Sequence, residues 1–364
     1  MKSIKELSLD ILSEIAIFPS VPFYESLIQT KICEILTQYS IEYFLDVFGN
    51  IIAEVGDESD DLNPIAFVAH MDHPGFEIEH NQDGELIALP KGGVPQFSLN
   101  HDCKMFSFNE LGERIPCVIS PNPKTPQTVI VNSDELLEIG SPLTFDLKDF
   151  EIQDNKILMR SADDFAGCAS ILTSLIESRG KVDRKIYGVF TRAEEVGLIG
   201  ARLIARDQII PRNSIVVSVE TSSVIPGIKQ GDGPVIRTGD ASYTFNAFAE
   251  NLLSVSANQL KSKHDFFQFQ RSLMSAGTCE ASAFAANGYL STGIAFPLGH
   301  WHNAKTTIPD INGGIDTENI SVDDYVNGVL LMIECSQLSS IESQDSITKK
   351  LIDIPSDFES RLRN

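Results

Sequence analysis

The chain has 364 residues, which is enough for two domains with one large core, and its formal net charge is −23. This acidity makes nucleic acid and anionic membranes poor partners. The hydrophobic share of 42% and the charged share of 22% are ordinary for a soluble globular protein. No apolar stretch is long enough to predict a membrane-spanning helix.

Six cysteines are scattered along the chain, and none forms a CxxC pair, so neither a zinc ribbon nor a redox motif is expected. Their mostly apolar surroundings are typical of reduced, buried thiols in the cytosol. Residues 4–18 place acidic side chains inside an apolar pattern, which predicts an amphipathic helix and not a signal peptide. We therefore expect a cytoplasmic protein.

The first 70 residues predict two helices and three strands. In chain order these elements lie at 4–18, 24–38, 41–48, 51–55 and 65–70. The last run is apolar until it reaches His70, and this is typical of a strand that is covered on both faces.

Residues 76–150 contain many short apolar runs between Pro, Gly, Asn and Asp, which predicts a small β-rich domain inserted into an α/β domain. The helix and strand pattern returns at Lys156. Further helices are expected at 164–178, 198–206, 251–270, 279–286 and 321–338, and strands at 186–190, 215–219 and 294–296. The predicted domains are an α/β domain (1–73 and 156–364) and an inserted β-barrel or PDZ-like domain (74–155).

Six acids and histidines are candidates for a functional site, and most of them directly follow an apolar run that predicts a strand. They are His70, Asp163, Glu194, Glu195, Glu220 and His302. Ligands of open α/β sheets bind at the carboxyl ends of the strands. Two imidazoles and several carboxylates are suitable ligands for a pair of divalent metal ions. The sequence therefore predicts a two-metal hydrolase.

His70 and Asp72 are two residues apart, so in an extended segment their side chains point to the same side. His70 can then bind a metal while Asp72 reaches its other ring nitrogen, or a neighbouring group, from behind. Taken alone, such a triplet is more often a surface histidine near an acid.

Asp163 and Asp164 precede a predicted helix. The Asp163 carboxylate could bridge two metals with one oxygen on each, while Asp164 helps to start the helix. The alternative is that both acids simply cap that helix, and the two interpretations have equal weight.

Glu194 and Glu195 follow a buried strand, where adjacent carboxylates repel each other unless a cation is present. Neighbouring side chains point apart, so Glu195 could bind a metal while Glu194 takes a proton from the metal-bound water and returns it to the leaving nitrogen. The alternative is a solvated pair of acids at the start of a helix.

Glu220 is a single acid at the end of the next strand, and its alternatives are a helix cap or a salt bridge. The last ligand could be His300 or His302, which the residues alone do not distinguish. The remaining histidines have no surroundings typical of a metal site and are expected to be surface or structural residues. They are His73, His80, His101 and His264.

The order of these motifs resembles the M42 family of metallo-aminopeptidases, within the co-catalytic zinc peptidases. The matching segments are Ala69-His70-Met71-Asp72, Ala162-Asp163-Asp164, Glu194-Glu195-Val196-Gly197, a strand-end acid and a late histidine. The resemblance extends roughly from Asp10 to Leu338. The long segment between Asp72 and Asp163 lies where M42 peptidases carry an inserted β-rich domain, whereas M20 peptidases place their extra domain before the last histidine.

The resemblance implies a mixed-sheet, three-layer zinc-peptidase domain of the phosphorylase/hydrolase-like type, with Asp163 bridging two metal ions. It implies that His70 and Glu220 complete the first site, Glu195 and His302 complete the second, Glu194 is the general base and Asp72 orients His70. Zinc is expected, with cobalt or manganese as alternatives, and large homo-oligomers such as dodecamers are expected. The implied activity is removal of N-terminal residues from peptides.

Two positions depart from the family pattern. Glu220 stands where M42 peptidases usually have Asp, and Phe165 stands where an Arg usually follows the acidic pair. One rival hypothesis is an M20-like deacylase or carboxypeptidase-type amidohydrolase on the same metal pair. The other is a non-catalytic homologue that binds partners through the inserted domain.

Overall fold

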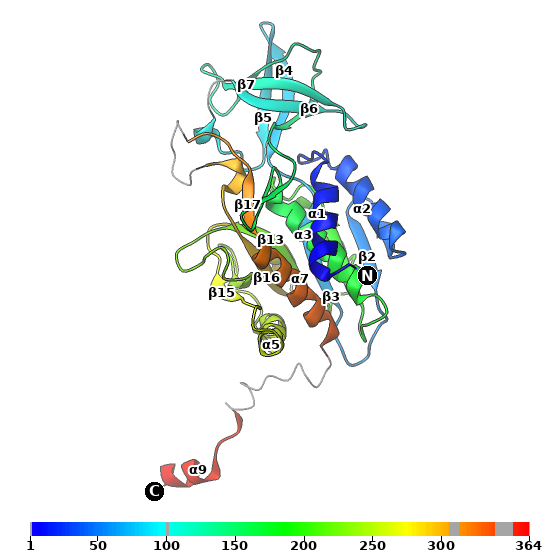
Figure 1. Ribbon diagram of the computed structural model, residues 1–364, viewed down its shortest axis with the longest axis vertical. Helices are drawn as coiled ribbons and strands as arrows, with labels where there is room; N and C mark the ends of the chain where they lie inside the picture. The colour runs from blue at the N-terminus through cyan, green and yellow to red at the C-terminus, as the bar shows by residue number, and fades with distance from the viewer. Residues whose placement is uncertain (1, 100–101, 306–312, 339–351, 364) are drawn as a thin grey trace.

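The computed structural model describes residues 2–99, 102–305, 313–338 and 352–363 (Figure 1). Its α-helices are α1 (Ile4–Ala16), α2 (Ser26–Gln38), α3 (Ala162–Ser178), α4 (Ile199–Asp207), α5 (Ala247–Lys263), α6 (Glu280–Ala286), α7 (Val322–Gln337) and α9 (Ser356–Leu362). Two short 3-10 helices, η1 (Gln96–Ser98) and η2 (Trp301–Asn303), lie in loops. No helix in the described ranges is long and apolar enough to cross a membrane.

The largest sheet has eight strands in the order β1-β2-β12-β3-β13-β16-β14-β15. Their bounds are β1 (Glu42–Leu45), β2 (Ile51–Val55), β3 (Ile65–His70), β12 (Ile186–Thr191), β13 (Ile215–Ser223), β14 (Val235–Gly239), β15 (Gln270–Leu273) and β16 (Leu290–Leu298). The central strands β12, β3, β13 and β16 are parallel. Their carboxyl ends therefore lie at one edge of the sheet, where functional groups can gather.

The two faces of this sheet are covered by different helices, which makes the mixed three-layer arrangement. In β3, Ile65, Phe67 and Ala69 join a core with α1, α2, α3, α5 and α7. The intervening Ala66 and Val68 join a second core with α4 and α6. Every residue of β3 is buried, because both faces are covered. This burial on both faces explains why the sequence of β3 is a continuous apolar run up to His70.

A closed barrel is formed by six antiparallel strands between Gly75 and Phe145, and Figure 1 shows it at the top of the molecule. The strands are β4 (Gly75–Gln82), β5 (Glu85–Lys91), β6 (Cys103–Phe108), β7 (Arg114–Pro121), β8 (Val129–Asn132) and β9 (Pro142–Phe145). Its own apolar core includes Phe76, Met105 and Phe145. The exact division of the chain into domains stays a prediction.

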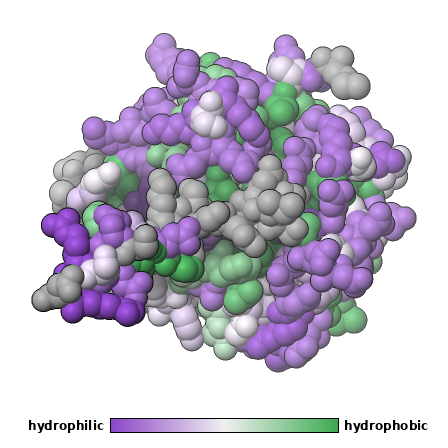
Figure 2. Space-filling model, turned by 90° about the horizontal axis from the view of Figure 1, so that it is seen from below, coloured by the Kyte–Doolittle hydropathy of each residue, from purple (hydrophilic) through white to green (hydrophobic). Residues whose placement is uncertain are grey.

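A third sheet joins β10 (Glu151–Gln153), β11 (Lys156–Met159) and β17 (Glu318–Ser321). β17 leads directly into α7, and the Ser321 side chain accepts hydrogen bonds from the first turn of that helix, as its capping sequence predicts. The outer surface of the molecule is largely hydrophilic in the view of Figure 2, in line with the acidic composition.

The structure corrects several predicted element bounds. The helix expected at 251–270 begins earlier, at Ala247, because the Asn246 side chain caps it, and it ends at Lys263. The strand expected to end at residue 219 continues to Ser223, because β16 pairs with it along its whole length. Strands β14, β15 and β17 were not expected, since short strands with mixed polarity carry little periodic signal.

Candidate metal centre

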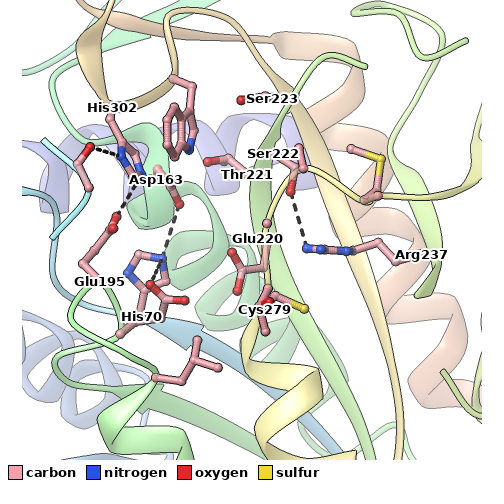
Figure 3. A pocket seen from close by; sticks show the side chains of 18 of the residues that line it. His70, Asp163, Glu195, Glu220, Thr221, Ser222, Ser223, Arg237, Cys279 and His302 are labelled. Atoms are coloured by element: carbon pink, nitrogen blue, oxygen red, sulfur yellow. Dashed lines mark hydrogen bonds and ion pairs between the residues drawn. The ribbon is translucent and has the colours of Figure 1, made fainter. Parts of the chain in front are cut away.

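The six candidate residues all line one cavity of about 780 Å³ at the carboxyl edge of the large sheet. Figure 3 shows five of these side chains converging from β3, the start of α3, β13 and the segments that follow β12 and β16, and it labels them as His70, Asp163, Glu195, Glu220 and His302. Among the residues that the structure describes, three overlapping groups of potential metal ligands are present: one combines His70 with Glu194 and Glu195, and the other two share Asp163. We call His70, Asp163 and Glu220 the first site, and Asp163, Glu195 and His302 the second site.

Asp163 lies between the two imidazoles. Its Oδ1 is 3.3 Å from His70 Nε2, and its Oδ2 is 3.8 Å from His302 Nε2. The two oxygens of one carboxylate therefore face different histidines. This is the arrangement that a bridging ligand needs, and Asp163 is buried among these groups.

Glu194 and Glu195 point in different directions, as expected for adjacent residues. Glu195 Oε1 lies 3.4 Å from His302 Nε2, in the second site. Glu194 Oε2 instead lies 3.9 Å from His70 Nε2, beside the first site. The two acids thus have separate positions along the same cavity wall, and separate chemical roles are possible.

Glu220 lies within β13 and faces the cavity opposite His70 (Figure 3). Ser218, two residues earlier on the same strand, donates a hydrogen bond from Oγ to Glu220 Oε1 at 3.2 Å. The Glu220 side chain is longer than that of the Asp usual in the family, and its carboxylate still lies within the first site. The other departure from the family pattern, Phe165, is fully buried in the core formed with α1 and α7.

Asp72 is completely buried behind the site, and its carboxylate makes its hydrogen bonds to backbone. Oδ1 accepts from Glu194 N at 2.9 Å, and Oδ2 accepts from Glu195 N at 3.1 Å. His70 Nδ1 lies 3.0 Å from the Asp72 carbonyl oxygen and 3.7 Å from its Oδ1. Asp72 therefore contacts both His70 and the loop that carries the two glutamates.

The structure separates the two late histidines. His302 lies in the second site, while His300 turns away and pairs through Nδ1 with the Thr317 carbonyl at 2.8 Å. The His302 ring pairs through Nδ1 with the Gly93 carbonyl of the β5–β6 connection at 2.7 Å. Trp301 stacks on the same ring, with 3.7 Å between centroids. His302 is therefore held from two sides.

Two further residues of the site were not expected from the sequence. His73 is fully buried and reaches the Asp163 carbonyl through Nδ1 at 2.6 Å and Asn303 Oδ1 through Nε2 at 2.9 Å. Glu318 is also fully buried and accepts hydrogen bonds from the backbone of Asp163 and His302. Glu318 begins the short strand β17, whose sequence Glu-Asn-Ile-Ser has mixed polarity, so no local pattern distinguishes it. His80 and His264 are exposed, and His101 lies outside the described residues.

Burial of so many acids changes their protonation in the cation-free protein. Burial raises the pKa of Glu220 and of Asp72 to about 7, and it raises the pKa of Glu194 well above its usual value. Burial alone would lower the pKa of His70, but the Glu194 and Asp163 carboxylates together raise it well above its usual value. The cluster therefore favours bound positive charge, either protons or cations.

The residues present fit divalent cations. Each site brings three ligand atoms within 4.8 Å of one another, from one imidazole and two carboxylates. This mixture of nitrogen and oxygen ligands suits zinc and related transition metals. Repulsion between the buried carboxylates would be relieved by the same ions.

Arg237 of β14 lies on the cavity wall next to Glu220 and is 3% exposed. Its Nη1 donates to Ser222 Oγ at 3.4 Å, and its Nε has no hydrogen-bond partner within the part of the chain that the structure describes. Within the residues that the structure describes, no salt bridge joins a carboxylate to the Arg237 guanidinium. A buried, incompletely paired guanidinium that lines a cavity is suited to bind an anionic group of a ligand.

The sequence profile described as M42 glutamyl aminopeptidase matches residues 49–315. A protein of Acetivibrio thermocellus with the name "Putative aminopeptidase" is 26% identical over 326 residues, which cover 84% of this chain and 96% of that protein. An aminopeptidase structure from the archaeon Desulfurococcus kamchatkensis covers 97% of this chain and 100% of its own, with 20% identity and a TM-score of 0.78.

The TET1 peptidase of Pyrococcus horikoshii is also similar, with 20% identity and a TM-score of 0.75 over 91% of this chain and 100% of its own. At such identities the two solved structures show the fold, which is the expected α/β domain with a small β-rich region. The profile match covers most of the chain, and all six candidate residues lie within residues 49–315. The chain therefore belongs to the M42 peptidase family and is a peptide hydrolase.

Proposed function

We propose that this protein is an aminopeptidase that depends on two divalent metal ions and removes N-terminal residues from peptides. The observation that carries the proposal is the pair of ligand groups sharing Asp163, with Glu194 beside them in the same cavity. His70, Asp163 and Glu220 would hold one ion, and Asp163, Glu195 and His302 the other. Zinc suits these ligands, and cobalt or manganese are alternatives.

Bound divalent ions supply Lewis-acid polarisation of the scissile carbonyl and favour deprotonation of the attacking water. The general base in this proposal is Glu194, which lies in the cavity without being needed to complete either site. Burial raises the pKa of its carboxyl group in the cation-free protein, and nearby positive charge would return it to the ionised form. Glu194 then accepts the proton of the water and passes it to the leaving amine.

The guanidinium of Arg237 supports an acidic N-terminal residue as the preferred substrate. Ser222 and Glu220 lie two apart on β13 and face the same cavity, so Arg237 is close to the first site. A Glu or Asp side chain of the substrate would supply the carboxylate that the guanidinium lacks. The net charge of −23 disfavours acidic substrates overall, but a local cationic group can outweigh a distant field.

The same proposal includes a cytoplasmic location and assembly into a homo-oligomer such as a dodecamer. The TET1 peptidase of Pyrococcus horikoshii is described as able to assemble into a tetrahedron or a large octahedral shell. The similarity in fold over nearly the whole chain supports a comparable assembly here. Sedimentation of the purified protein tests this, and a monomer at micromolar concentration would contradict it.

The mechanism is tested with Glu194→Gln. Because the variant cannot accept a proton, kcat on aminoacyl-nitroanilides should fall about 100- to 10,000-fold. Elemental analysis should still find the parent metal content, since Glu194 is not needed to complete either site. The matched control is Glu177→Gln, which changes a glutamate on the surface of α3 that pairs with Lys181. Parent turnover by Glu194→Gln with full metal content would contradict the role of the base.

The competing function is a deacylase or carboxypeptidase-type amidohydrolase on the same metal pair. Substrates with a free α-amine should be hydrolysed, and the same peptides with an acetylated amine should not be. Activity on the blocked peptides alone would replace the aminopeptidase proposal with this alternative.

A further inference from the structure

Glu318 of β17 is the feature that the proposed mechanism does not use. Its side chain is completely buried, and each carboxylate oxygen accepts one backbone hydrogen bond. Oε2 accepts from Asp163 N at 2.9 Å, and Oε1 accepts from His302 N at 2.9 Å. A single side chain thus joins the backbones of two ligand residues that come from distant parts of the sequence.

Both backbone segments need an acceptor from outside their own secondary structure. Asp163 has dihedral angles outside the helical region although it lies in the first turn of α3. His302 has a φ of +51°, in the left-handed region that residues other than glycine rarely adopt. A conformation of this kind persists only where surrounding groups hold it. The Glu318 carboxylate is one such group for both residues.

We propose that Glu318 is a positioning residue that fixes Asp163 and His302 relative to each other and thereby sets the second site. The proposal rests on the proposed function in one respect, namely that the second site binds a cation. Glu318 does not itself belong to either group of ligands, because both of its oxygens are directed at backbone amides. Its influence therefore reaches the ion through Asp163 and His302.

Asp72 shows the same arrangement elsewhere around the centre. Its two oxygens accept from the backbone amides of Glu194 and Glu195. Between them, the two buried acids hold the backbone of four of the residues around the cations. A carboxylate is required at each position, since an amide group offers one acceptor oxygen and would direct an N–H against the second backbone N–H.

The test uses Glu318→Gln in the full-length protein, with two measurements. In the metal-free protein, hydrogen exchange at the amides of Asp163 and His302 should become about tenfold faster, because one of the two acceptors is lost. In zinc titrations, the second equivalent should bind about 10- to 100-fold more weakly, the usual effect of removing a group that orients ligands. The first equivalent should change less, since Glu318 bonds to only one residue of the first site, Asp163, but to two residues of the second.

Asp324→Asn is the matched control. The Asp324 carboxylate is also fully buried and also accepts two backbone hydrogen bonds, from Gly231 N at 2.8 Å and Gly233 N at 2.7 Å. It lies outside both sites. We expect this variant to lose stability while keeping parent zinc affinity in both steps. An equal loss of zinc affinity in Asp324→Asn would show a general loosening of the fold and would overturn the proposal.

Glu318→Asp replaces Glu318→Gln if the latter does not fold, because the shorter carboxylate can reach only one of the two amides. Parent exchange rates together with parent affinity for the second equivalent, in whichever variant folds, would overturn the positioning role. If the parent protein binds no second equivalent, the proposed function fails, while the exchange rates at Asp163 and His302 still decide the role of Glu318.

Discussion

At the scale of single residues, the centre depends on acids with different surroundings. Asp163, Glu195 and Glu220 direct their oxygens into the cavity, where cations can bind. Asp72 and Glu318 direct theirs at backbone amides. Sequence reasoning found Glu195 and Glu220 because they follow predicted strands, Asp163 because it precedes a predicted helix, and Asp72 from its spacing to His70. It missed Glu318, because a carboxylate that accepts hydrogen bonds from backbone amides far away in the chain leaves no pattern in the neighbouring sequence.

Arg237→Met tests the substrate preference. Losing a charge-assisted contact should lower kcat/KM for a glutamyl-nitroanilide about 10- to 100-fold, and for a leucyl-nitroanilide less than about threefold. Arg271→Met is the control, because Arg271 is exposed and paired with Glu250. An equal loss on both substrates would mean that Arg237 does not bind the substrate side chain.

At the scale of elements, the candidate metal centre lies where the edge of the large sheet meets the barrel. The connection that follows β5 passes directly over the second site: the Gly93 carbonyl pairs with His302, and a Cβ added at Gly92 would lie 2.9 Å from Glu195 Cβ. Only residues without a side chain fit this approach. The barrel therefore contributes to the shape of the metal centre, although none of the candidate ligands belongs to it.

Gly93→Ala should displace the second-site histidine, since the new Cβ would lie 2.6 Å from His302 Cε1. We expect the second zinc equivalent to bind about tenfold more weakly, as when a group that orients a ligand is removed. Gly277→Ala is a suitable control for zinc titrations, because a Cβ there meets nothing within 4 Å. Unchanged zinc affinity in Gly93→Ala would contradict the contribution of the barrel.

At the scale of the whole molecule, the sequence predicted the α/β layers and the small β-rich region well. Long buried runs such as Ile65–His70 have a clear cause, because helices cover both faces of the sheet. Strands β14, β15 and β17 were missed, since their pairing partners are distant and their polarity is mixed. The convergence of Asp163 and His302 likewise depends on tertiary packing, which periodicity does not encode.

The metal-free protein should become less stable as the pH rises from about 4 to about 7. Burial raises the pKa of Asp72 and Glu220 to about 7 in the folded state, whereas both titrate near their usual values of 3.8 and 4.5 when unfolded. The folded state therefore binds more protons in this interval, and its advantage is lost as they dissociate. The raised pKa of His70 has the same sign, but its contribution is lost only as the pH rises above its usual value of 6.5.

Urea unfolding in the presence of a chelator measures this dependence. The midpoint should be lower at about pH 7.5 than at about pH 5, and added zinc should reverse the trend because cations replace the bound protons. A midpoint that rises with pH in the chelator would contradict the account of the buried acids.

Trp301 gives the protein an optical signal of its own. It is the only tryptophan in the chain, and its indole stacks on the imidazole of His302. Tryptophan emission from the whole molecule therefore originates beside the second site. Any event that moves or charges that imidazole will change the emission, so ion loading can be followed by intrinsic fluorescence without a label.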